Sequence, residues 1–207
     1  MTETTMETRS LAGSTVGLAV EEREGDQAPM LTGYAAVFDR QSEDLGGFIE
    51  TIARGAFTNV LASNPDVRAL VNHNKSEILG RTKSGTLRLM EDGVGLRYEI
   101  DVPNTVTARS VVSAIKRGDI DGSSFTFRVA PGGDKWAFPD EGPAMRTVTE
   151  FGELLDVGPV TFPAYPDTTA ASRSLETARA KECESPSGSK VGILRRRLDL
   201  RERNAQF

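Results

Sequence analysis

The sequence predicts a mainly β protein with flanking helices, an α+β fold. Apolar and polar residues alternate over many short stretches, as expected for strands with one buried face. The clearest pair is a hairpin, in which residues 86–90 and 94–102 alternate on either side of the turn Glu91-Asp92-Gly93. Residues 103–116 instead carry apolar residues at helical spacing. Strands and helices do not alternate regularly, so a parallel α/β fold is not expected.

The first third of the chain reads as a polar lead followed by a hairpin and a short helix. Residues 1–13 are polar and acidic, and we expect them to be a disordered N-terminal lead. Residues 14–22 alternate and predict a strand, and residues 30–38 predict a second strand that pairs with it. Apolar residues then recur at broadly helical spacing, which predicts a short helix over 54–62 that ends before Pro65.

The middle of the chain contains the only histidine and the best helix. A short apolar strand, 67–71, runs directly into His73. The helix over 103–116 has Thr105 or Asn104 as its N-cap, and Gly118 ends it.

Residues 119–129 place two serines at the start of a strand. Phe125 and Phe127 fall on one face, and Ser124 and Thr126 fall on the other. If the aromatic rings point into the core, Ser124 faces an open cleft and Ser123 points inward. A serine held this way suits a nucleophile, although serine beside glycine is also ordinary turn chemistry.

The last part of the chain closes the domain and carries a tail. Residues 130–145 are rich in glycine and proline and predict a hairpin excursion, and 154–162 predict a strand. Pro159 indicates an edge strand or a bulge in that stretch. A helix is expected over 168–181. The predicted domain spans 14–180, followed by a flexible linker (181–190) and a basic helix or tail (191–207).

Composition excludes several classes of protein. The 207 residues carry 25 Lys+Arg and 30 Asp+Glu, which argues against a dedicated nucleic-acid binder. No apolar run approaches the ~20 residues of a membrane helix. One cysteine cannot form an intramolecular disulfide, which fits a cytoplasmic setting. With one histidine and one cysteine, a zinc site would need mostly carboxylate ligands, which zinc rarely accepts. We expect no cofactor or metal.

A serine becomes nucleophilic when an imidazole takes its proton and a carboxylate orients that imidazole. His73 is the only imidazole in the chain, and Ser124 is the preferred serine. Asp156 lies inside an apolar run and requires either solvent or a partner. It is the first candidate for the acid, with Glu153 and Glu150 as alternatives.

Several blocks, taken together, resemble the tailed-phage prohead (head maturation) serine protease family. The resemblance covers about residues 33–168. Its blocks are Gly33-Tyr34-Ala35-Ala36-Val37-Phe38, His73 with Ile78-Leu79-Gly80-Arg81-Thr82, Gly85-Thr86-Leu87, Ile115-Lys116-Arg117-Gly118-Asp119-Ile120, Ser124-Phe125-Thr126-Phe127 and Val160-Thr161-Phe162-Pro163-Ala164-Tyr165-Pro166. Thr126 departs from the glycine that is usual beside the serine.

The resemblance implies a fold similar to the herpesvirus assemblins, with a β-barrel-like core wrapped by helices. It implies a catalytic triad of Ser124, His73 and Asp156. It also implies a protease that acts inside the assembling prohead in the host cytoplasm, on scaffolding protein or the scaffold segment of the capsid protein, and on itself. A homodimer is implied by analogy. The competing hypothesis is a non-catalytic, β-rich capsid or scaffold assembly protein, and a small-molecule esterase is a weaker third.

Overall fold

The computed structural model describes residues 5–13, 17–25, 28–162 and 168–184. The elements, in chain order, are β1 (Glu7–Leu11), β2 (Ala19–Glu21), β3 (Met30–Val37), β4 (Phe48–Ile52), α1 (Thr58–Ala62), β5 (Arg68–Leu70), β6 (Ile78–Arg81), β7 (Leu87–Glu91), β8 (Gly95–Asp101), α2 (Val106–Arg117), β9 (Gly122–Val129), β10 (Asp134–Ala137), β11 (Ala144–Val148), β12 (Phe151–Val160) and α3 (Thr168–Glu184).

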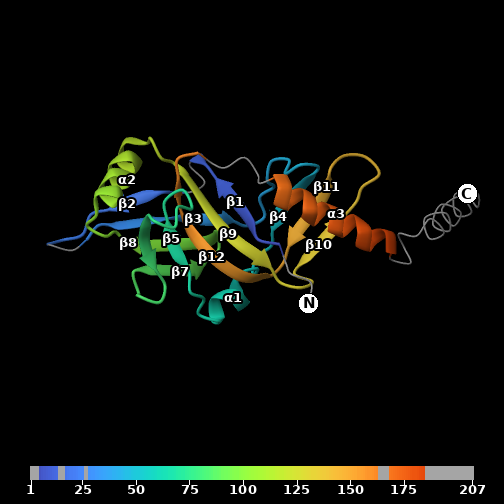
Figure 1. Ribbon diagram of the computed structural model, residues 1–207, viewed down its shortest axis with the longest axis horizontal. Coiled ribbons are helices and arrows are strands. Elements are labelled where there is room, and N and C mark those ends of the chain that lie inside the picture. The colour runs from blue at the N-terminus through green and yellow to red at the C-terminus, as the bar shows by residue number, and fades with distance from the viewer. Residues whose placement is uncertain (1–4, 14–16, 26–27, 163–167, 185–207) are drawn as a thin grey trace, which may run out of the picture.

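The strands form three sheets. A five-stranded sheet has the order β1-β9-β12-β5-β6, a four-stranded sheet the order β2-β3-β8-β7, and a three-stranded sheet the order β10-β11-β4. Figure 1 shows β9 and β12 crossing the middle of the molecule, with α2 at one end and α3 over the other. The mainly β class with few helices is therefore confirmed. The sheets of the described residues do not close into a barrel.

The main core lies between the five-stranded and four-stranded sheets. Phe125 and Phe127 of β9 stack with ring centroids 4.7 Å apart, and Phe57 and Phe151 stack at 4.3 Å. Tyr98 of β8 is fully buried in the same cluster. Burying large aromatic rings contributes much of the stability of such a core and holds β9 rigidly in place.

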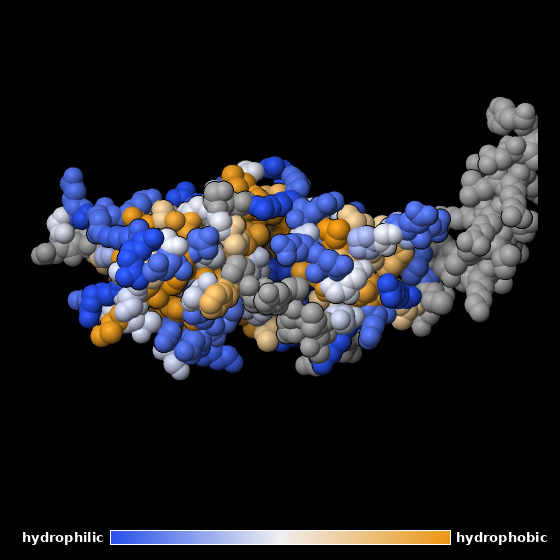
Figure 2. Space-filling model, turned by 90° about the horizontal axis from the view of Figure 1, so that it is seen from above, coloured by the Kyte–Doolittle hydropathy of each residue, from blue (hydrophilic) through white to orange (hydrophobic). Residues whose placement is uncertain are grey.

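A smaller core joins α3 to the three-stranded sheet. Ala171 and Leu175 of α3 pack against Phe48 of β4 and Ala144 of β11. On the outside, Figure 2 shows hydrophilic residues over most of the visible face, with hydrophobic residues in small patches between them.

Most of the predicted elements are present. The 30–38 strand pairs with β2 as a hairpin, and β7 and β8 form the clearest predicted hairpin. Helix α2 begins after Thr105, whose Oγ1 accepts a hydrogen bond from the N–H of Ala108 at 3.2 Å. It ends at Gly118, which has a left-handed φ of 80°.

The expectation of a disordered lead over 1–13 is wrong for its second half. Residues Glu7–Leu11 form β1, which pairs antiparallel with β9. The stretch is polar, and polarity suggested disorder. However, Glu7 and Arg9 are buried and paired with opposite charges in other strands, so the strand does not need apolar residues to dock.

Three other expectations need correction. Residues 48–52 belong to the stretch whose apolar residues recur at broadly helical spacing, but they form β4, because Phe48, Glu50 and Ile52 alternate inward beside β11. The helix that follows is shorter than 54–62. The strand that contains Pro159 is not an edge strand, because β12 lies between β9 and β5. The alternative, a bulge in this stretch, is confirmed by the register shift between Leu154 and Asp156.

The C-terminal boundary also moves. Helix α3 extends to Glu184 and so includes the first four residues of the predicted linker. Residues 185–190 of that linker, the basic tail 191–207 and the block 163–166 lie outside the described residues. Of the predicted strand over 14–22, the described part forms β2 over Ala19–Glu21 only.

Candidate active site

His73 lies in a tight turn just after β5. Both Asn72 and His73 have left-handed backbone conformations, with φ of 51° and 56°. Such a conformation is uncommon outside glycine and persists only when the surrounding contacts hold it. The N–H of Asn72 donates to the carbonyl of Pro159, and its side chain bonds to both the backbone N–H and the hydroxyl of Thr161. These bonds fasten the histidine turn to the end of β12.

Ser124 lies on β9, between β1 and β12. It is opposite Ser10 of β1 on one side and Gly158 of β12 on the other. The predicted facing of the two serines is correct. Ser123 points into the core, where its hydroxyl donates to the hydroxyl of Tyr98 at 3.1 Å, while Ser124 points to the other face.

The structure brings the three candidate side chains together. Nε2 of His73 lies 2.7 Å from Oγ of Ser124, and Nδ1 lies 2.5 Å from Oδ1 of Asp156. An ionised carboxylate can only accept hydrogen bonds, so Nδ1 carries the hydrogen toward Asp156. In the neutral imidazole, Nε2 is then free to accept the proton of Ser124.

A bulge in β12 places Asp156 on the same face as Ser124. Leu154 and Val157 are both buried in the core, although three positions separate them and a regular strand would put them on opposite faces. The register shift between Leu154 and Asp156 restores the inward direction for Val157 and turns Asp156 outward, opposite Thr126. The bulge therefore decides which acid can reach His73.

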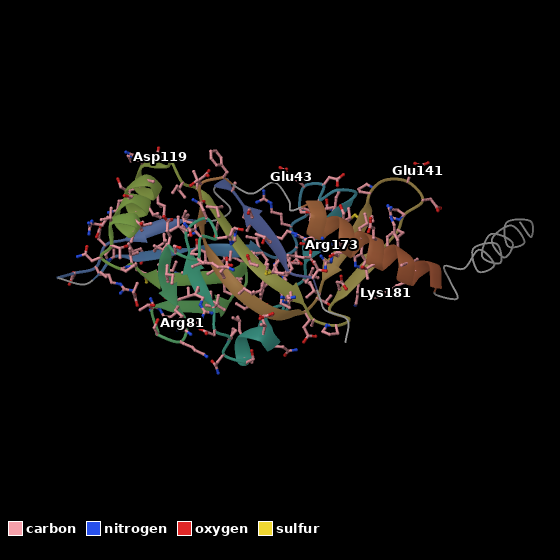
Figure 3. All side chains as sticks on the ribbon, in the orientation of Figure 1. Glu43, Arg81, Asp119, Glu141, Arg173 and Lys181 are labelled. Carbon is pink, nitrogen blue, oxygen red and sulfur yellow. The ribbon has the colours of Figure 1, made fainter. Side chains whose placement is uncertain are left out.

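The other candidates lie elsewhere. Glu153 pairs with Arg128 at 2.9 Å, and Glu150 accepts a hydrogen bond from the side chain of Asn59 at 2.8 Å. Arg81 forms two hydrogen bonds with Asp66, both 2.7 Å long, and lies at the rim of the molecule (Figure 3). None of these side chains has a hydrogen bond to His73 or Ser124 among the described residues.

Sequence reasoning missed two residues of the site. Oγ1 of Thr126 lies 3.3 Å from Nδ1 of His73, so this threonine touches the ring beside the Asp156 contact. It lies two residues after Ser124 on the same face, and that alternation could have identified it. Asn72 shapes the histidine turn, and asparagine is one of the few residues that readily adopt its left-handed conformation.

The site is covered, contrary to the expectation of an open cleft. Ser124 is 0% exposed, and β1 pairs with β9 beside it, with Ser10 directly opposite Ser124. Oγ of Ser124 donates to the carbonyl oxygen of Arg9 at 2.8 Å and accepts from the hydroxyl of Ser10 at 2.9 Å. The side chain of His73 remains 27% exposed on the other side.

A buried ion cluster holds β1 in place on its inner face. Nε and Nη2 of Arg9 bind the two carboxylate oxygens of Glu50 at 2.8 and 2.9 Å, and Nη2 binds Glu7 at 2.6 Å. Nη1 of Arg146 binds Glu7 at 2.7 Å and Glu50 at 2.9 Å. These four side chains offset one another's charge away from water, and Nε of Arg146 also binds the half-buried Asp134 at 2.9 Å.

The cluster shifts the pKa values of its members. Burial alone would raise the pKa of Glu7, but the nearby Arg146 and Arg9 outweigh burial and lower it. Burial would lower the pKa of Arg9, but Glu50 and Glu7 raise it instead. The carboxylate of Glu7 and the guanidinium of Arg9 are therefore both charged near neutral pH.

Two pockets lie on the surface of the described residues. One of about 640 Å³ borders β1 and is lined by residues that include Ser10, Arg40, Glu43, Glu50 and Phe125. The other, of about 650 Å³, lies beside α2. Neither pocket is lined by Ser124, His73 or Asp156, and the first adjoins the site through β1.

The described residues contain no group of three or more histidine, cysteine, aspartate and glutamate side chains placed to hold a metal ion. No helix among them combines the length and the apolar character needed to cross a membrane.

Comparisons with known proteins place the chain in a family. The model of the family described as "Caudovirus prohead serine protease" matches residues 17–182. Among solved structures, the capsid assembly protease gp21 of bacteriophage T4 is similar, with 12% identity and a TM-score of 0.46 over 78% of this chain and 99% of that chain. No curated protein sequence matches.

Proposed function

Because the chain belongs to the family of caudovirus prohead serine proteases, we propose that Ser124, His73 and Asp156 form its catalytic triad. One observation carries this proposal. The only histidine of the chain lies within hydrogen-bond distance of a serine through one ring nitrogen and of a carboxylate through the other. Family membership makes the chain a serine protease, so the hypothesis of a non-catalytic assembly protein is wrong.

The chemistry follows from the direction of these hydrogen bonds. Ser124 Oγ attacks the peptide carbonyl carbon while Nε2 of His73 takes its proton. Asp156 holds the other ring nitrogen and stabilises the imidazolium that forms. His73 then gives the proton to the leaving amine, and the acyl-enzyme on Ser124 remains. Water, deprotonated by the same nitrogen, hydrolyses that ester.

The substrates we propose are proteins of the assembling capsid. A prohead protease acts where scaffolding protein or the scaffold segment of the capsid protein is packed against it, and on its own chain. Removing these segments as fragments would clear the interior of the shell. This assignment rests on the family.

The test is cleavage of the matching capsid and scaffolding proteins. We expect defined fragments with the wild type and no fragments with Ser124→Ala or His73→Ala, a loss of about 10⁴-fold or more. Ser123→Ala is the matched control, because its hydroxyl points to Tyr98 and not to His73. Fragments of unchanged rate from Ser124→Ala would refute the triad, and circular dichroism checks that each variant folds.

A further inference from the structure

Strand β1 lies where a substrate must lie. A nucleophile can act only on a carbonyl that reaches it, and the whole approach to Ser124 Oγ along β9 is filled by Arg9 and Ser10. We infer that β1 occupies the peptide-binding channel of the protease as a displaceable, substrate-like strand. The channel then takes an extended peptide that has arginine before the scissile bond and glutamate two residues earlier. This inference rests on the proposed function of Ser124.

The backbone of β1 is presented to the site as a bound peptide would be. It pairs antiparallel with β9 in the register Arg9 opposite Phe125 and Ser10 opposite Ser124. Main-chain pairing to a sheet edge is a general way to bind an extended peptide, with pockets for alternate side chains providing specificity. The carbonyl next to the nucleophile belongs to Arg9, so a substrate residue in that place precedes the scissile bond.

In this position β1 blocks the site and is not cut. The hydroxyl of Ser124 has one hydrogen, and two acceptors compete for it: Nε2 of His73 and the carbonyl oxygen of Arg9. The Arg9 contact is a hydrogen bond to the carbonyl oxygen, whereas attack requires approach to the carbon. The hydroxyl of Ser10 also donates a hydrogen bond to Oγ of Ser124 and so occupies one of its lone pairs. Strand β1 therefore competes with the base for the proton that catalysis needs.

The side chains of β1 reveal what the channel would select. Glu7 and Arg9 share the inner face, two residues apart, as alternation in a strand requires. Beneath them, Glu50 of β4 and Arg146 of β11 are directly paired across the two parallel strands and are 2.9 Å apart. This acid–base pair remains when β1 leaves.

The fit of each side chain to that pair is specific. The carboxylate of Glu50 accepts two hydrogen bonds from the guanidinium of Arg9, and lysine cannot reproduce this bidentate geometry. The guanidinium of Arg9 also lies 5.5 Å from the ring centroid of Phe127. Arg146 takes the carboxylate of Glu7 at 2.7 Å. A peptide of the form Glu-x-Arg would restore all of these bonds, and a peptide with the charges reversed would oppose them.

Among the described residues, no strand other than β9 pairs with β1, so the rest of the sheet does not need β1. Strand β1 is the outer strand of its sheet. It also precedes residue 17, where the match to the family model begins. Its departure would leave β9 as the edge strand, open along its length to a substrate.

The first experiment measures access to Ser124 in the full chain with a small fluorophosphonate, followed by intact-protein mass. Arg9→Ala removes both the Glu50 and the Glu7 contacts, and we expect labelling to accelerate about tenfold or more. Arg54→Ala is the control, because Arg54 pairs with the exposed Asp39 at 2.7 Å and lies outside the sheet that contains β1. An Arg9→Ala rate equal to that of wild type and control would overturn the inference.

The second experiment needs no variant of β1. The wild-type chain is treated with a peptidyl diphenyl phosphonate that carries Glu-Thr-Arg, and a reagent with Arg replaced by Gln is the comparison. We expect the Arg reagent to modify Ser124 at least tenfold faster, and hydrogen exchange to show loss of protection in residues 7–11 once it is attached. Modification with those amides still protected, or no preference for Arg, would overturn the inference.

A third variant tests the proposed recognition. In Glu50→Gln, the preference for the Arg reagent over the Gln reagent should fall about tenfold, because the bidentate ion pair is lost. The outcomes also separate this inference from the proposed function. If Ser124 cleaves capsid protein but β1 stays docked with the reagent bound, only the channel inference fails. If Ser124 is labelled in no variant, the triad fails as well.

Discussion

Oδ1 of Asp156 and Nδ1 of His73 meet at 2.5 Å across 83 positions of the chain. The contact sets the tautomer of the ring, and a bulge in β12 makes it possible. Asp156→Asn keeps the size of the side chain but can donate to Nδ1, which favours the wrong tautomer. We expect the rate of capsid-protein cleavage to fall about 10⁴-fold with little loss of stability.

Glu153→Gln is the control for that measurement. Glu153 lies on the same strand, but it is exposed and pairs with Arg128. A surface ion pair contributes little, so its cleavage rate should stay within about twofold of wild type. Equal losses in both variants would show that the acid acts through strand stability and not through the ring.

Gly158 lies opposite Ser124 and has no room for a side chain. A Cβ there would come within 2.1 Å of the carbonyl oxygen of Leu70, and its φ of 153° is unfavourable for other residues. We expect Gly158→Ala to lower the free energy of unfolding by about 2–5 kcal/mol, measured with urea, and to reduce cleavage. In Gly85→Ala, where φ is 73° and no atom lies within 4 Å of the added Cβ, about 1 kcal/mol is expected.

Asn72 holds the turn that carries His73. Asn72→Gly retains the left-handed conformation but loses the side-chain bonds to Thr161. The turn should loosen, and we expect kcat/KM to fall about tenfold, since misplacing a catalytic group is costly. Asn64→Gly is the matched control, because Asn64 has a φ of 50° at the end of α1. If both variants retain full activity, the turn does not need this anchor.

Glu7 makes the docking of β1 sensitive to acid. Its pKa is below the usual value of 4.5, because Arg146 and Arg9 outweigh burial. A carboxyl with a lowered pKa stabilises the fold above its unfolded pKa, and this contribution disappears as pH falls through the folded pKa. We expect the stability difference between wild type and Glu7→Gln to be constant from pH 7 to about 5 and to shrink below that.

Urea unfolding of both proteins at several pH values checks this prediction. The subtraction removes the titration of acids common to both proteins, provided that Glu50, Arg9 and Arg146 keep the same surroundings. A difference that grows as the solution becomes more acidic would contradict the lowered pKa.

How far could the sequence lead? Alternation identified β7, β8 and β9, because the period of two is local and needs no partner. The same parity separated Ser124 from Ser123, since the aromatic residues mark the core face. The single histidine limited the base to His73. The resemblance to the protease family then assigned Ser124 and His73 to one site.

The tertiary structure decided the rest. The facing of Asp156 depends on a bulge that only the pairing with β9 creates, so sequence alone left Glu153 and Glu150 open. Strand β1 is polar and looks disordered by composition; it is ordered because Glu7 and Arg9 find Arg146 and Glu50 on strands more than 40 positions away. The sequence by itself determined which residues could do the chemistry, because residue type and alternation are local. Long-range pairing alone decided which acid faces the ring and that a strand of the same chain covers Ser124.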